Sequence, residues 1–186
     1  MTGPDHPVVA RPGTRVGVDV GSVRVGLAVS DPAGSLAMPV DTLPRDTSPA
    51  RSDQARIAGL VREREAVEVV AGLPLLMSGL EGEAARLARS YAGELALLVA
   101  PVPVRLVDER LTTVQSHRTL RESGVAGRAQ RKVVDQAAAV LILQAALDGE
   151  RATGRAQGEL VEQVAPMDGG DRDTKRRRPR RKDPRA

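Results

Sequence analysis

The stretch Val16-Gly-Val-Asp-Val-Gly-Ser-Val-Arg-Val-Gly-Leu-Ala-Val-Ser-Asp31 alternates apolar residues with small or polar ones on both sides of a Gly-Ser turn. This period of two predicts a hairpin of two β-strands. The other face of the first strand carries Asp19 between Gly17 and Gly21, where the missing side chains would let a backbone, a phosphate or a metal ion approach. A buried carboxylate is costly without such a partner. Because a solvated Asp on an edge strand has the same local pattern, the other motifs must decide between the two interpretations.

The composition limits the core and the sites that the chain can build. Its 186 residues include no Cys, Phe or Trp, and its one tyrosine is Tyr91. The core must therefore be aliphatic, and a surface that stacks bases on aromatic rings is not expected. The absence of Cys excludes disulfides and cysteine nucleophiles and is compatible with the cytoplasm. We find no secretion-signal pattern and no apolar run long enough to span a membrane, so no membrane partner is expected.

Basic charge is concentrated at the end of the chain. The formal net charge is +4, but residues 171–186 hold nine Lys or Arg and three Asp, which leaves 19 basic and 21 acidic residues elsewhere. We expect a disordered leader over residues 1–13, one domain over 14–150, and a weakly helical, then disordered basic tail over 151–186. The tail either solubilises the protein or attracts phosphates loosely, and it carries no chemistry.

The order of the predicted elements indicates an α/β fold. Three short strands form an antiparallel meander, and the third contains Pro39, which suits an edge position. Strands and helices then alternate; the strands are predicted over 16–20, 23–30, 35–43, 67–74 and 102–107, and the helices over 49–65, 81–98, 112–124 and 131–147. This order predicts an RNase H-like mixed five-stranded sheet, with the later strands parallel and helices on both faces.

Three acidic positions fall where this sheet brings strand ends together with the last helix. Asp19 lies in the first strand, and Asp108 and Glu109 end the fifth. Asp135 begins the last helix, on the face that also carries small and apolar residues three, four and seven positions later. Such a face packs closely against a sheet, so Asp135 is expected to point inward, where it needs a cation as its partner.

Carboxylates gathered in one cleft predict a divalent metal ion, because they repel one another unless a cation neutralises them. Two Mg²⁺ or Mn²⁺ ions about 3.5–4 Å apart can activate a water and stabilise the leaving oxygen in phosphodiester cleavage. Neighbouring residues of a strand point to opposite faces, so only one of Asp108 and Glu109 can face Asp19. We favour Glu109 as the ligand and keep Asp108 as the alternative.

Basic side chains and glycines give weaker indications. The candidates for phosphate contacts are Arg24, Arg110, Arg131 and Lys132, although surface cations are more often only solvated. Two glycines also precede the second predicted helix, where backbone N–H groups can bind a phosphate. A plain connection between strand and helix explains these glycines equally well.

Four motifs in register carry a resemblance to a known family. They are Val18-Asp-Val-Gly-Ser-Val-Arg-Val-Gly-Leu-Ala-Val-Ser-Asp31, Val70-Ala-Gly-Leu-Pro74, Val107-Asp-Glu-Arg-Leu-Thr-Thr113 and Val134-Asp-Gln-Ala-Ala-Ala-Val-Leu-Ile-Leu-Gln144. Over about residues 14–148 the chain resembles the YqgF/RuvX family of RNase H-like proteins. Members of this family are described as pre-16S rRNA nucleases and as homologues of Holliday junction resolvases.

The resemblance implies an RNase H fold, a cytoplasmic location, a divalent-metal nuclease site and a role in maturing the 5′ end of 16S rRNA. By motif, Asp19, Glu109 and Asp135 take the acidic positions of the family. The related RuvC-type resolvases carry an acid at the end of the fourth strand, where this chain has Gly72-Leu-Pro74, so their mechanism does not transfer directly. We expect pre-16S rRNA or branched DNA as substrate, a ribosome precursor as a further partner, and a monomer or a homodimer.

Two other classes of function remain compatible with the sequence. Nucleotide binding of the actin and sugar-kinase type also uses an Asp-x-Gly turn around phosphates, but it needs two RNase H-like halves. A non-catalytic nucleic-acid-binding or transcription-associated factor would keep the fold without using the acids. Variants of the three acids that leave 16S processing intact would favour this last alternative.

Overall fold

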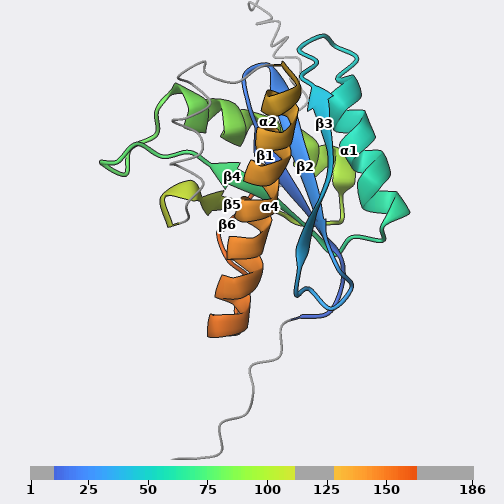
Figure 1. The fold of residues 1–186 in the computed structure, drawn as a ribbon, viewed down its shortest axis with the longest axis vertical. Coiled ribbons are helices and arrows are strands. Elements are labelled where there is room, and N and C mark those ends of the chain that lie inside the picture. Colours follow the sequence, from blue (N-terminus) through green and yellow to red (C-terminus); the bar gives the residue numbers. More distant parts are fainter. Residues whose placement is uncertain (1–10, 112–127, 163–186) are drawn as a thin grey trace, which may run out of the picture.

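A six-stranded sheet forms the centre of the molecule, with two helices on one face and one long helix on the other (Figure 1). The computed structural model describes residues 11–111 and 128–162, and the side chains of 11–110 and 136–162. The strands are β1 (Arg15–Val20), β2 (Arg24–Ser30), β3 (Ala37–Pro44), β4 (Glu68–Leu73), β5 (Val104–Asp108) and β6 (Glu159–Leu160). The helices are α1 (Ser52–Glu63), α2 (Glu83–Val99), the 3₁₀ turn η1 (Glu109–Leu111) and α4 (Arg128–Thr153).

The strand order is β3-β2-β1-β4-β5-β6. The strands β1, β2 and β3 pair antiparallel, and β4 and β5 run parallel to β1. The meander, the edge position of β3 and the RNase H-like α/β fold are therefore confirmed. The sheet has six strands where five were predicted, because β6 is only two residues long and gives no periodic signal.

The alternation in β1 separates two cores. Val16, Val18 and Val20 belong to the cluster formed with α1 and α2, whereas the intervening residues face α4. A Cβ placed on Gly17 would lie 2.8 Å from Cβ of Leu143 in α4. Glycine is therefore required here for α4 to pack directly on the backbone of β1.

The helix α1 begins three residues later than predicted. Its first residue, Ser52, follows Arg51, whose φ of 44° is left-handed. The backbone N–H and the hydroxyl of Ser52 each donate to Oδ2 of Asp46 at 2.8 Å. The side chain of Asp46 therefore supports the helix start from across the intervening turn.

The folded part extends to both sides of the domain predicted over 14–150. The side chain of Arg11 bonds to Glu150, and β6 pairs with β5 beyond the end of α4. The helix predicted over 112–124 and most of the predicted leader and tail lie outside the described residues. Within the part of the chain that the structure describes, no helix has the length and apolar character needed to cross a bilayer.

Candidate active site

Asp19 lies in the middle of the sheet on the face that α4 covers. Asp19 is 0% exposed, and it pairs with Gly26 of the antiparallel strand β2. The missing side chain of Gly17 lets α4 come close on this face, because a Cβ there would lie 3.0 Å from the carbonyl oxygen of Ala139. A carboxylate buried so deeply is unfavourable in its charged form unless cations or hydrogen-bond donors face it.

Glu109 reaches the same face from the end of β5. It is the first residue of η1, and it is 2% exposed. A Cβ placed on Gly72 of β4 would collide with Oε1 of Glu109 and would lie 2.7 Å from Cδ1 of Ile142 in α4. The carboxyl group of Glu109 therefore lies directly over the bare backbone of Gly72, between the sheet and α4.

The register of the parallel strands places the two acids in one row. Val18 of β1 pairs with Ala71 of β4, so the next residues along these strands are Asp19 and Gly72. Gly72 in turn pairs with Val107 of β5, two residues before Glu109. Asp19 and Glu109 therefore lie on the face that α4 covers, at the carboxyl ends of parallel strands. The strand β4, with Gly72, lies between them.

Asp108 is engaged elsewhere. Its carboxylate accepts hydrogen bonds from the backbone N–H of Arg110 at 2.9 Å and from the guanidinium Nη2 at 2.7 Å. These bonds lower the pKa of Asp108 below its usual value and raise the pKa of Arg110. Of the two neighbours, Asp108 therefore pairs with Arg110, and Glu109 is the acid that lies over Gly72.

For the third predicted acid, Asp135, the structure describes the backbone only. Asp135 belongs to α4, one helical turn before the buried Ala138 and Ala139, but its side chain is outside the described ones, as are those of Arg131 and Lys132. Among the described side chains, those of 11–110 and 136–162, no group of three or more His, Cys, Asp or Glu could hold a metal ion. The convergence of all three acids therefore stays a prediction.

The two described basic candidates lie at the same end of the sheet as the acids. Arg24 begins β2, and its backbone carbonyl accepts the N–H of Gly21 at 2.9 Å in the turn after β1. The side chain of Arg110 is 31% exposed and is fixed by Asp108.

Gly72 is the functional position whose role sequence reasoning missed. Its place in the motif was noted, but only as the absence of an acid. The signal was a glycine near the end of a strand whose other residues are mainly β-branched or apolar, a position where glycine commonly marks close approach of another group.

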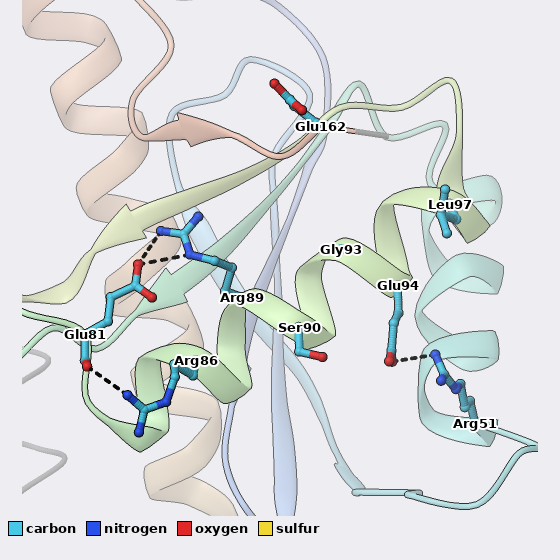
Figure 2. Close-up of a pocket in the computed structure, with 9 residues that line it drawn as sticks. All are labelled: Arg51, Glu81, Arg86, Arg89, Ser90, Gly93, Glu94, Leu97 and Glu162. Atoms are coloured by element: carbon cyan, nitrogen blue, oxygen red, sulfur yellow. Dashed lines mark hydrogen bonds and ion pairs between the residues drawn. The ribbon is translucent and has the colours of Figure 1, made fainter. Parts of the chain in front are cut away.

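A pocket lies on the opposite side of the sheet from the acids, beside α2 (Figure 2). Two of its arginines are paired with carboxylates: Arg89 bonds to Glu81 and Glu159, and Arg51 pairs with Glu94. The third, Arg86, donates to the backbone carbonyl of Glu81. The charges here serve to join α2 to α1, β6 and the preceding loop. This pocket is therefore a weaker candidate for binding an anion than the acidic edge is for binding a cation.

Comparison with known proteins gives a consistent result. A family model described as "RuvX: Holliday junction resolvase" matches residues 13–149. A protein of Frankia casuarinae named "Putative pre-16S rRNA nuclease" is 57% identical over 157 residues, which are 84% of this chain and 76% of that protein. A protein of the same name from Nocardioides sp. is 54% identical, and the match covers 83% of this chain and 99% of that protein. Another from Streptomyces avermitilis is 53% identical, and the match covers 83% of this chain and 97% of that protein.

Solved structures were compared in the same way. The RuvC of T. thermophilus in complex with a Holliday junction substrate has a TM-score of 0.49 and 18% identity, and the match covers 79% of this chain and 99% of that one. A second structure of Thermus thermophilus RuvC has a TM-score of 0.46 and 16% identity.

Proposed function

The chain belongs to the RuvX family, and from this membership we propose that it is a metal-dependent endonuclease that processes the 5′ end of pre-16S rRNA. The names of relatives that are more than half identical over the aligned residues support the substrate. The observation that carries the chemistry is the carboxyl group of Glu109 over Gly72, in one row with Asp19. A cytoplasmic location and a ribosome precursor as partner belong to the same proposal.

The donor set suits a hard divalent cation. Carboxylate oxygens are the ligands that Mg²⁺ and Mn²⁺ prefer, and the glycine between the two acids leaves space that a Cβ would fill. Asp19 and Glu109 would hold the ion, with Asp135 as the third ligand supplied by α4. When bound, the ion would neutralise the phosphodiester and lower the pKa of an attacking water.

The remaining work falls to the chain itself. The packing of α4 on Gly17 and Gly72 fixes the distance between sheet and helix, and so holds the acids in place. Burial keeps bulk water from surrounding these carboxylates, which strengthens their attraction for a cation. Arg24, Arg110, Arg131 and Lys132 would position the phosphates on either side of the scissile bond.

The test compares cleavage of a pre-16S RNA by the wild-type chain and by Asp19→Asn, Glu109→Gln and Asp108→Asn. We expect the first two variants to lose about a thousandfold in rate, because several kcal/mol of transition-state stabilisation depends on their charge. Asp108→Asn should lose far less. Full activity in Glu109→Gln together with its loss in Asp108→Asn would exchange the roles of the two neighbours. Full activity in all three variants would contradict the assignment of the acids, and no cleavage by the wild-type chain would contradict the nuclease proposal.

A branched DNA is the second candidate substrate, because the description of the family model names Holliday junction resolvase. The acids would perform the same chemistry on either backbone, since phosphodiester geometry is shared and specificity comes from shape and pairing. Cleavage of a four-way DNA junction and of a pre-16S RNA, measured side by side with one protein preparation, distinguishes the two.

A further inference from the structure

The loop between β4 and α2 presents apolar side chains to solvent. Leu76, Met77 and Leu80 are 51%, 80% and 68% exposed, and Figure 1 shows this green loop projecting from the body of the molecule. Neighbouring apolar side chains left in water commonly mark an interaction site. We call this connection, residues 74–82, the apolar loop.

The apolar loop is held in one shape before any partner binds. The backbone N–H of Leu76 donates to the carbonyl of Leu80 at 2.9 Å, and the N–H of Gly79 donates to the carbonyl of Leu76 at 2.8 Å. Gly79 has a φ of +85°, which glycine adopts without strain. These bonds tie the loop into a tight turn with Met77 at its tip, so little ordering is needed when a ligand docks.

Its position connects the apolar loop to the proposed active site. The loop begins at Pro74, two residues after Gly72, over which the carboxyl group of Glu109 lies. A Cβ on Gly79 would be 3.2 Å from Nη1 of Arg110, so the guanidinium lies against the loop. Apolar contacts, a fixed cation and a buried acid therefore follow one another along a single edge of the sheet.

The chemistry of a nucleic acid identifies the partner that fits this edge. The faces of its bases are apolar and its phosphates are anionic, which matches the loop and Arg110 respectively. Ring stacking is not available, because the one aromatic residue, Tyr91, is 2% exposed. Aliphatic side chains and Met are known to contact base faces when a base is unstacked.

We propose that the apolar loop holds an unpaired nucleobase of the RNA beside the scissile phosphate, while Arg110 contacts the adjoining phosphate. The inference rests on the proposed function and adds a preference to it: the substrate is single-stranded at the cleavage position. In a duplex both faces of each base are stacked on neighbours, so the loop would find no free face to cover.

The test uses the full chain and two fluorescein-labelled RNAs, a single strand of about 12 nucleotides and the same strand annealed to its complement. Dissociation constants are measured by fluorescence anisotropy in EDTA, where no metal-dependent cleavage occurs. The double variant Met77→Ser, Leu80→Ser should bind the single strand about tenfold more weakly and the duplex unchanged. Leu98→Ser is the matched control, because Leu98 is 49% exposed at the far end of α2.

Each alternative outcome overturns the inference. Equal affinity of the wild-type chain for the two RNAs would do so, and so would unchanged single-strand binding by the double variant. An equal loss in Leu98→Ser would show that the effect is not specific to the loop. Cleavage by Asp19→Asn tests the proposed function separately. If Asp19→Asn cleaves normally while the loop variant loses single-strand binding, only the proposed active site is contradicted. If Asp19→Asn loses cleavage while the loop variant binds normally, only the inference about the loop is contradicted.

Discussion

The two ends of the sheet face under α4 use buried charge in opposite ways. At one end Arg15, 1% exposed, donates to both oxygens of Glu150 at 3.0 and 3.1 Å. Arg11 bonds to Glu150 and Glu68, and Arg105 bonds to Glu68. At the other end Asp19 pairs with Gly26 in the sheet and Glu109 lies over Gly72. The first end is a charge network of paired residues, and the second places two buried acids on one face of the sheet, at the carboxyl ends of parallel strands.

The strongest way to break this comparison is to remove an acid from the charge network. Glu150→Ala leaves Arg15 buried beside one carboxylate fewer, and breaking such a buried pair destabilises a protein by about 3–5 kcal/mol. Urea denaturation measures the loss. Asp148→Ala is the control, because Asp148 lies on the same helix in an exposed pair with Arg151 and should change stability by less than about 1 kcal/mol.

Gly72→Ala tests the other end. The added Cβ would displace the carboxyl group of Glu109 and press on Ile142, so cleavage should fall about a hundredfold, the effect of misplacing a reacting group by about 1 Å. Overpacking should lower stability by about 1–3 kcal/mol. Rates are measured well below the melting temperature of the variant. Cleavage at the wild-type rate would mean that Glu109 does not act from its place over Gly72.

The pH dependence of stability should follow the charge network. The side-chain hydrogen bond from Arg11 lowers the pKa of Glu150 below its ordinary value of 4.5. Because the folded pKa is the lower one, this stabilisation is present above pH 4.5 and is lost as the pH falls through the folded pKa. Melting temperatures measured from neutral to acidic pH should therefore fall more steeply for the wild-type chain than for Glu150→Gln. Parallel curves would remove Glu150 from the acid transition.

Gly93→Ala is the smallest expected effect and the matched control for Gly72. It lies inside α2, and a Cβ there meets nothing within 4 Å. Replacing a helical glycine by alanine should stabilise the protein by about 0.5–1 kcal/mol and leave cleavage unchanged. A loss of activity equal to that of Gly72→Ala would show that cleavage responds to any glycine replacement.

The sequence predicted those features that depend on local periodicity. Alternation in residues 16–30 defined β1 and β2 and placed Asp19 opposite to the valine face, and Pro39 indicated the edge strand. The choice between Asp108 and Glu109 could be stated only as a preference, because it depends on where β5 ends and η1 begins. The role of Gly72 could not be predicted, because a glycine signals close approach without saying which group approaches.

The pairing of charges far apart in the sequence could not be predicted either. Arg11 and Glu150 are 139 positions apart, and Arg11 falls in the leader that was expected to be disordered. Likewise, Asp46 supports the start of α1 across a turn whose left-handed residue, Arg51, has no sequence signature. In both cases the partner is defined only after the sheet has formed.

The short strand β6 has a consequence for how the protein should be handled. It lies along β5, the strand that leads into Glu109, and the N–H of Val161 donates to the carbonyl of Val104 at 2.9 Å. A chain shortened to end at residue 150 would leave the backbone groups of β5 open to other chains, a situation that favours self-association. Preparations trimmed at residue 150 should therefore aggregate sooner than the 186-residue chain, at the strand that leads into Glu109.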